Sequence, residues 1–418
     1  MVQAQLITLR SVMLAMAAIQ LVTAASGTLV ALYFAETGAS QASAAIASAS
    51  YSLGFLLGCF FAAGPISNIG YIRSFSAGAA ISAGSALVFS LTEFEPALFF
   101  VRLMTGVATA GLFAIGDSWI NEAADKASRG RLLAIYAVVM GIMSVSSQIV
   151  IVLAPDDLDR AFVLVTLLYC FAIVVIAATR TTPPEIKSSA NVRVLPLLKE
   201  APTAMTGAFA VGFVQISVLS IVPYRLSVLG VSTIDVALLI GATYLGRILL
   251  QFPLGKRSDS TDRRRVIFAA SLFATVILLG LSYFGTGDGV AFLQTSAQYS
   301  IVPFLVISIL LGGSLLTIYS LLVAHALDRS APVFVSSSAV TMLLSYTIGS
   351  VVGPLFVSFA SGIAGDGALG WICFVVMACY TIYGAYRIKT VEPASRAEKA
   401  ERPIVNQNSL ELAPAAKR

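Results

Sequence analysis

Charged residues are scarce in this chain. Aspartate, glutamate, lysine and arginine make up 11% of its 418 residues, whereas hydrophobic residues make up 58%. A soluble domain normally carries about 25% charged residues. Too few charges are therefore present to cover a surface that faces water. The composition excludes an ordinary soluble protein and predicts that much of the hydrophobic surface faces lipid.

Histidine, cysteine and the sequence motifs of enzymes are also scarce. The chain has one histidine, and its four cysteines all lie inside hydrophobic runs: Cys59, Cys170, Cys373 and Cys379. None of them is spaced from a histidine or from another cysteine as in a metal site. The sequence contains no Walker phosphate-binding loop and no nucleophile elbow. We therefore expect no metal, no cofactor and no enzymatic activity.

Long hydrophobic runs are what the chain has in abundance. Each run is about 20 residues long, enough to cross about 30 Å of hydrocarbon as a helix at 1.5 Å per residue. Strands of a membrane barrel would instead alternate over about 10 residues. The first run is too long for the core of a signal peptide. We predict an all-α integral membrane protein with twelve transmembrane helices, at residues 11–35, 43–66, 74–92, 96–119, 131–153, 161–179, 203–228, 234–254, 266–284, 300–323, 334–359 and 370–388.

The positions of the positive charges predict the orientation. If the N-terminus is cytoplasmic, the loops on the cytoplasmic side carry most of the lysines and arginines, and the opposite loops are mostly acidic. This distribution satisfies the positive-inside rule. We expect a multi-pass protein of the cell (inner) membrane with both termini in the cytoplasm. Because the charge of +5 is explained by these loops, no nucleic-acid binding is expected.

The longest predicted cytoplasmic loop divides the chain into two sets of six runs. We predict an N-terminal six-helix bundle (1–179), a cytoplasmic linker (180–202), a C-terminal six-helix bundle (203–389) and a disordered cytoplasmic tail (390–418). The linker ends in a short amphipathic stretch near Val194–Lys199. An internal repeat supports the division, because turns that begin with glycine and end with cations follow both the second and the eighth run. The two bundles are therefore predicted to be pseudo-symmetric.

Several motifs resemble those of the major facilitator superfamily. The turn after the eighth run is similar to the loop signature of that family in Gly255, Asp259, Arg263 and Arg264. The copy after the second run is degenerate. Residues 102–106 look like the Arg-x-x-x-Gly pattern of the family's fourth helix, residues 129–131 resemble the Arg-Gly-Arg turn before the fifth helix, and residues 349–354 are similar to a Gly-Pro element of the eleventh.

Three other stretches resemble the YcaD-like branch of that family more closely. They are Asp117–Glu122, which contains a Trp-x-Asn-Glu element, Gln251–Gly255 and Val323–Arg329. The resemblance covers about residues 10–389. It implies the major facilitator fold and a secondary transporter that moves a small organic solute by alternating access. It also implies proton coupling and a monomer whose partners are the solute, the lipid bilayer and protons.

Other functions stay open at this point. Within transport, the alternatives are a facilitative importer of a vitamin-like solute such as riboflavin, and a drug or metabolite exporter. The fifth run has Gly141 alone, without the Gly-Pro element usual in proton-driven drug antiporters, which counts against that class. Outside transport, the alternative is a membrane receptor or scaffold.

Ionisable residues inside the runs indicate where a solute binds, because each is costly in lipid unless it faces a cavity or a partner. Arg102 is predicted to face the central cavity and attract an anionic or carbonyl-bearing solute, although a structural role with helix carbonyls is the alternative. Arg247 either joins it or extends to the membrane interface. Polar residues on the odd-numbered runs complete the predicted binding site: Gln20, Thr23, Gln148, Gln215, Tyr224 and Tyr346.

A second group of residues is predicted to gate the transporter on the cytoplasmic side. Asp259 is expected to cap a helix and pair with arginines of its own turn, which would hold the two halves together in one conformation. His325 is the candidate for proton coupling, with a position at the end of a helix as the alternative. The full predicted gating set is Asp117, Glu122, Arg129, Arg131, Gly255, Asp259, Arg263 and Arg264.

Overall fold

Helices make up the regular secondary structure of the residues that the structure describes. The computed structural model describes residues 2–61, 63–123, 129–179, 192–283, 301–331, 334–365 and 367–391, and no strand occurs among them. The first half consists of α1 (Val2–Glu36), α2 (Gln41–Phe61), α3 (Ala63–Ile69), α4 (Tyr71–Val88), α5 (Glu95–Ala123), α6 (Arg129–Ser146), α7 (Ile149–Val152) and α8 (Leu158–Ala177). The second half consists of α9 (Val194–Glu200), α10 (Pro202–Val228), α11 (Thr233–Ser260), α12 (Arg263–Tyr283), α14 (Val302–Arg329), α15 (Val335–Ala364) and α16 (Ala368–Thr390).

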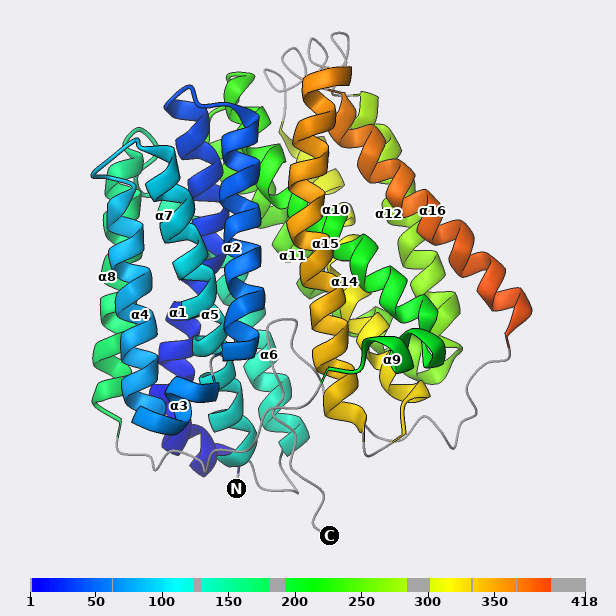
Figure 1. The fold of residues 1–418 in the computed structure, drawn as a ribbon, viewed down its shortest axis with the longest axis horizontal. Helices are drawn as coiled ribbons and strands as arrows, with labels where there is room; N and C mark the ends of the chain where they lie inside the picture. Colours follow the sequence, from blue (N-terminus) through cyan, green and yellow to red (C-terminus); the bar gives the residue numbers. More distant parts are fainter. Residues whose placement is uncertain are drawn as a thin grey trace.

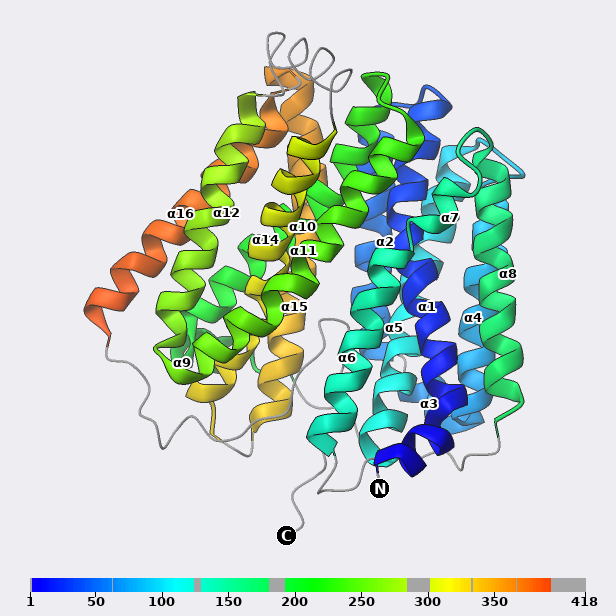
Figure 2. The same ribbon diagram turned by 180° about the vertical axis from the view of Figure 1, so that it is seen from behind.

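The two halves stand side by side, with their long helices running up and down (Figures 1 and 2). Helix α1 begins and α16 ends at the same end of the molecule, which we name the base, and we name the opposite end the top. Contacts of α1 with α10, of α2 with α15 and of α6 with α11 join the halves. These three helix pairs form the boundary between the halves.

Eleven of the described helices are long and apolar enough to cross a membrane. Helix α4 stands in the place of the third predicted span but is shorter and rich in serine and glycine. It packs against α5 and α8. Large apolar side chains project outward all around the molecule, as at Leu91 (79% exposed) and Phe359 (69% exposed). The prediction of an all-α integral membrane protein is confirmed.

Some helix boundaries differ from the predicted ones. Helices α11 and α14 extend to Ser260 and Arg329, beyond the predicted ends at 254 and 323. The predictions stopped where hydrophobicity fell, but a helix continues past the lipid when its polar side chains find partners. The fifth predicted span is interrupted, because α6 ends at Ser146 and α7 begins at Ile149.

The end of the predicted linker lies against the second half. The backbone N–H of Arg193 donates a hydrogen bond to Thr341 Oγ1 on α15 at 2.9 Å, and the guanidinium carbon lies 3.5 Å from the centroid of the Phe334 ring. Helix α9 forms at the predicted amphipathic stretch. The earlier part of the predicted linker, 180–191, and nearly all of the predicted tail, 392–418, fall outside the described residues.

Glycines allow corresponding helix pairs of the two halves to pack closely. A Cβ atom on Gly106 of α5 would lie 2.1 Å from the Tyr51 carbonyl oxygen of α2. In the second half, a Cβ atom on Gly246 of α11 would lie 1.9 Å from the Ile309 carbonyl oxygen of α14. Helices α2 and α5 are the second and fourth spans of their half, and α11 and α14 are the second and fourth spans of theirs. The pseudo-symmetry predicted from the sequence therefore recurs in the helix packing.

We expect Gly106→Ala to destabilise the fold. The added methyl group meets backbone atoms of α2, so the two helices must separate, at a typical cost of about 1–3 kcal/mol. Gly84→Ala is the matched control, because a Cβ atom there meets nothing within 4 Å and alanine is the better helix former. Thermal unfolding in detergent should give a lower melting temperature for Gly106→Ala alone. Equal melting temperatures would contradict the close packing.

Candidate functional site

Arg102 lies inside the first half on α5 and is 6% exposed. Its guanidinium carbon lies 4.6 Å from the centroid of the Tyr51 ring on α2, in the geometry of a cation–π contact. The close approach of α2 and α5 at Gly54 and Gly106 brings this ring beneath the guanidinium group. The helix packing of the first half therefore fixes the position of a buried cation.

Arg102 Nε is buried and has no hydrogen-bond partner among the described residues. The Tyr169 hydroxyl lies near those of Thr23 and Ser82, and the Thr109 hydroxyl lies near that of Tyr51. Tyr169 lies on α8, within electrostatic range of Arg102 and beside Thr23. Unsatisfied polar atoms are costly in an apolar interior and are concentrated where a protein binds something. Thr23, which was predicted from the sequence, is thus brought near Arg102.

A second cation lies in the other half. Arg247 of α11 lies near Tyr346 of α15 and near Tyr244, one turn away on its own helix. The Tyr346 ring packs against Tyr319 of α14, with the ring centroids 4.7 Å apart. The structure therefore brings together Arg247 and Tyr346, which were both predicted from the sequence, and adds two tyrosines that were not.

Tyr51 connects the two groups across the boundary between the halves. It lies within electrostatic range of both Tyr244 and Tyr346 of the second half. Below these residues, Ala114 of α5 and Leu343 of α15 also pack together across the boundary. We name the whole group the arginine–tyrosine cluster; it consists of Arg102, Tyr51, Tyr169, Arg247, Tyr244, Tyr319 and Tyr346.

The predicted glutamines lie in other surroundings. Gln20 of α1 donates a hydrogen bond to Ser144 Oγ of α6 at 2.9 Å, so it joins two helices of one half. Gln148 lies between α6 and α7, where it donates to Ser147 Oγ and lies opposite Gly241 of α11. Gln215 is buried in α10. The side-chain oxygens of Gln148 and Gln215 have no hydrogen-bond partner among the described residues.

Tyr224 connects the halves near the top. Its hydroxyl donates a hydrogen bond to the Ala39 carbonyl, in the turn between α1 and α2, at 2.7 Å. In this conformation the hydroxyl is directed to the first half and not to the arginine–tyrosine cluster. The residue that the sequence suggested for binding is thus placed as a contact between the two halves.

We expect Tyr224→Phe to loosen the contact at the top. One lost hydrogen bond is worth about 0.5–1.5 kcal/mol, which raises the population of the open state roughly two- to tenfold. A cysteine at Ala237, which is fully buried among residues of the first half, reports the opening by its labelling rate in a background without the four native cysteines. Tyr33→Phe, which loses a bond to the Thr92 carbonyl within one half, is the control. Equal labelling rates in both variants would exclude this role.

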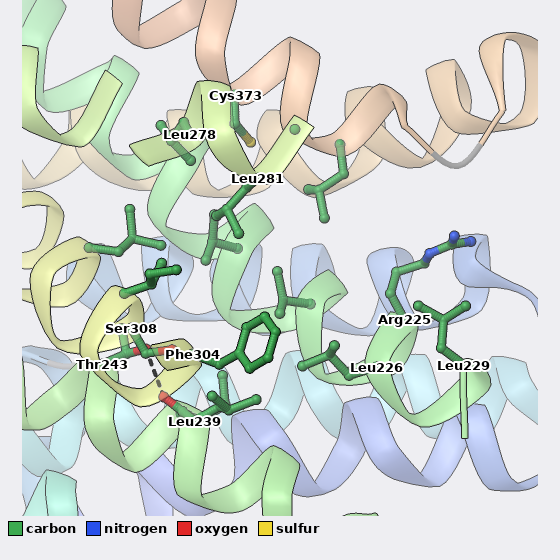
Figure 3. Close-up of a pocket in the computed structure, with 17 residues that line it drawn as sticks. Arg225, Leu226, Leu229, Leu239, Thr243, Leu278, Leu281, Phe304, Ser308 and Cys373 are labelled. Atoms are coloured by element: carbon green, nitrogen blue, oxygen red, sulfur yellow. Dashed lines mark hydrogen bonds between the residues drawn. The ribbon is translucent and has the colours of Figure 1, made fainter. Parts of the chain in front are cut away.

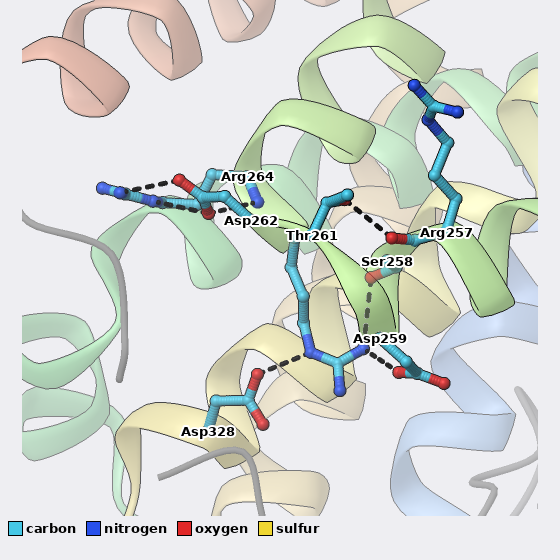
Figure 4. Close-up of polar contacts among 8 residues, drawn as sticks. Arg257, Ser258, Asp259, Thr261, Asp262, Arg264 and Asp328 are labelled. Carbon is cyan, nitrogen blue, oxygen red and sulfur yellow. Dashed lines mark hydrogen bonds and ion pairs between the residues drawn. The ribbon is translucent and has the colours of Figure 1, made fainter. Parts of the chain in front are cut away.

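At the base, a polar network joins three helices of the second half (Figure 4). The Arg263 guanidinium at the start of α12 donates to Asp328 at the end of α14, to Ser258 Oγ and, at 2.7 Å, to Asp259 Oδ1 at the end of α11. The Asp328 side chain is 2% exposed and that of Asp259 is 68% exposed. Among the described residues, all partners of Arg263 belong to the second half, so this network stabilises that half in the present conformation.

Arg264 forms a neighbouring contact. It pairs with Asp262 at 2.9 Å and donates to the Val391 carbonyl at the end of α16 at 2.7 Å. Burial alone would raise the pKa of the Asp262 carboxyl, but hydrogen bonds from Arg264 outweigh it and lower the pKa. The lowered pKa means that Asp262 stays ionised and can hold Arg264 against α16.

The other predicted gating residues are less closely connected to the polar contacts of Arg263 and Arg264. Asp117 is 2% exposed on α5 and accepts a hydrogen bond from the Tyr136 hydroxyl of α6 at 2.8 Å. Arg131 is exposed on α6, and the side chains of Glu122 and Arg129 fall outside the described residues. Gly255 has open space around it. His325 is 6% exposed on α14, within electrostatic range of Arg264 and Asp262.

A pocket also lies within the second half, between α10, α11, α12, α14 and α16 (Figure 3). Its walls are mostly apolar, as at Leu226, Leu278 and Phe304, and Arg225 stands at one edge. The Thr243 hydroxyl is used within its own helix by a bond to the Leu239 carbonyl. Because all its lining residues belong to one half, this pocket is not a passage between the halves.

Sequence reasoning missed the additional tyrosines and Asp328. A tyrosine in a hydrophobic helix is as often a lipid-facing or packing residue as a binding residue. Only the rotation of the helices in the structure identifies Tyr51, Tyr169, Tyr244 and Tyr319 as members of the cluster. Asp328 lies inside the stretch 323–329, which resembles the YcaD-like branch. Its position beside Arg329 in the sequence gave no sign that Arg263 would be its partner.

Comparisons with known proteins agree with this architecture. A family model described as "Major Facilitator Superfamily" matches residues 12–344 and 204–416. The YcaD protein of Shigella flexneri, named an uncharacterized MFS-type transporter, is 28% identical over 353 residues, covering 83% of this chain and 88% of the relative. An uncharacterized MFS-type transporter of Enterobacter sp. (strain 638) is 28% identical over 352 residues, with the same coverage. The resemblance to the YcaD-like branch is confirmed.

Solved structures show the same fold at low sequence identity. The nucleoside transporter NupG superposes with a TM-score of 0.70 at 12% identity, covering 91% of this chain and 99% of that one. A D-xylose–proton symporter gives 0.69 at 14% identity, covering 93% and 98%. A bacterial homologue of the human lysosomal transporter Spinster, inward-facing and occupied, gives 0.69 at 15% identity, covering 92% and 97%.

Proposed function

Because the chain belongs to the major facilitator superfamily, a family of secondary transporters, we propose that it moves a small organic solute across the cell inner membrane by alternating access, coupled to protons. The observation that carries the proposal is the arginine–tyrosine cluster, which has side chains from both halves and two cations, the buried Arg102 and the partly buried Arg247. A site shared by two halves is what rocking of one half against the other requires.

The charge distribution supports a cytoplasmic base. Exposed cations stand at the base ends of the helices, as at Lys256, Arg257 and Arg265, whereas Glu36 and Asp235 lie at the top. Positive charge is retained on the cytoplasmic side of membrane proteins. With this orientation, both ends of the described chain are cytoplasmic, and the Tyr224–Ala39 hydrogen bond lies on the outer side.

Two buried groups support proton coupling. Asp117 lies within α5 with a hydrogen bond from Tyr136, and His325 lies within α14 near the base network. Each belongs to a helix that also contributes to the arginine–tyrosine cluster, namely Arg102 on α5 and Tyr319 on α14. A proton taken up at either position is thereby placed to influence the helix that holds the solute.

Net flux into liposomes tests the transport function. Purified protein in vesicles that contain a pH-sensitive dye is exposed to a library of small metabolites, with and without an imposed proton gradient. We expect at least one solute to accumulate only in protein-containing vesicles and to move protons with it. A receptor or scaffold would bind a solute without any flux, and flux that ignores the gradient would remove the proton coupling while leaving transport.

A further inference from the structure

Two arginines within the membrane-spanning helices, the buried Arg102 and the partly buried Arg247, lack acidic partners. Neither Arg102 nor Arg247 forms an ion pair with any described residue, and the electrostatic partners of both are tyrosines. By contrast, Arg263 and Arg264 at the base are each held by aspartates. A buried guanidinium group without a counter-ion is costly. The protein therefore keeps two positive charges, one in each half, that its own described side chains do not neutralise.

The surroundings of these charges are aromatic. The Tyr51 ring lies against the Arg102 guanidinium, Tyr244 and Tyr346 lie near Arg247, and the Tyr319 ring packs against that of Tyr346. Tyrosine rings offer flat apolar faces for stacking together with hydroxyl groups for hydrogen bonds. An aliphatic anion would use the arginines and leave these faces unused. The combination favours a ligand that is both negatively charged and aromatic.

We propose that the transported solute is an aromatic organic anion, held between Arg102 of the first half and Arg247 of the second, with its ring against the tyrosines. The proposal rests on the transport function above and specifies its substrate class. A planar carboxylate matches the fork of a guanidinium group, which can donate two hydrogen bonds to it. The unsatisfied Arg102 Nε is a donor available to such a group.

The anion would also act as the counter-ion that allows the halves to close. Without it, each half keeps an arginine that no described acidic side chain neutralises. With it, each half is attracted to the same bound charge. A dianion that supplies one carboxylate to each arginine should therefore bind more tightly than a monoanion with the same ring.

Binding to the purified protein tests the substrate class separately from transport. The probes are benzoate and terephthalate, with the neutral amides benzamide and terephthalamide, and the non-aromatic dianion trans-cyclohexane-1,4-dicarboxylate. Isothermal titration in lipid nanodiscs should rank terephthalate above benzoate by about tenfold or more, each acid above its amide, and terephthalate above the cyclohexane dianion. In Arg102→Gln and in Arg247→Gln, terephthalate should lose its advantage over benzoate. Arg160→Gln, an exposed arginine at the top (side chain 80% exposed), should keep it.

The outcomes separate this inference from the proposed function. Equal binding of acids and amides, or an advantage of terephthalate that survives both arginine substitutions, overturns the anion class. Binding of the cyclohexane dianion as tight as that of terephthalate overturns the aromatic part. If aromatic anions bind as ranked but none of them crosses vesicles that contain the protein, the transport function fails and the binding site stands. If only uncharged solutes are transported, the transport function stands and the aromatic-anion substrate class fails.

Discussion

Arg102→Ala is expected to abolish transport while leaving the fold intact or more stable. The guanidinium group is 6% exposed and forms no ion pair with a described residue, so its charge costs stability in the unliganded protein. Losing a buried, charge-assisted contact with the solute typically costs about 2–5 kcal/mol in binding, a loss of roughly 30-fold or more. The expected result is thus a loss of flux together with an unchanged or raised melting temperature.

The comparison with lysine makes this prediction specific. Arg102→Lys keeps the positive charge but loses the planar fork and the wide face over the Tyr51 ring. It should retain weak transport, between that of the wild type and that of Arg102→Ala. Flux is measured in proteoliposomes at matched protein content, with Arg160→Ala as a control. Normal flux in Arg102→Ala, or a large fall in its melting temperature, would show that Arg102 is a structural residue.

Asp328→Asn is expected to have the second large effect. Asp328 is 2% exposed at the end of α14 and pairs with Arg263, itself 12% exposed. Removing one partner of a buried pair typically costs about 3–5 kcal/mol, because the remaining charge is left buried. The family's loop motif singles out Asp259 instead, but its carboxylate is 68% exposed, and exposed pairs are worth about 0–1 kcal/mol.

A double-mutant cycle measures how much more strongly Arg263 is coupled to Asp328 than to Asp259. Asp328→Asn and Asp259→Asn are each combined with Arg263→Gln, and the unfolding free energy of every variant is measured in the same detergent. The coupling of Arg263 to Asp328 should be at least about 2 kcal/mol larger than its coupling to Asp259. Transport should fall in parallel with stability in Asp328→Asn and remain near normal in Asp259→Asn. Equal couplings would show that Asp328 is not the stronger partner of Arg263.

The candidate site could be predicted only in part. Arg102 and Arg247 were found because an ionisable residue within a hydrophobic run is unusual wherever it points. Tyr346 and Thr23 were found as polar residues on odd-numbered spans, and the structure brings them near the arginines. The same reasoning also selected Gln20, which bonds to a neighbouring helix. A polar residue in a span can face a ligand or another helix, and its residue type does not distinguish the two.

The sequence alone determined that this protein is a helical membrane protein of two similar halves. Run length, the near absence of charge within the runs and the placement of cations in the loops are local properties, and the lipid bilayer converts them directly into spans. Which side chains meet was decided only by tertiary structure. Tyr51 lies beneath Arg102 because Gly54 and Gly106 let two helices touch, and Arg263 reaches Asp328 because three helix ends converge at the base. These contacts depend on the rotation and separation of whole helices, which are set by packing across the entire bundle.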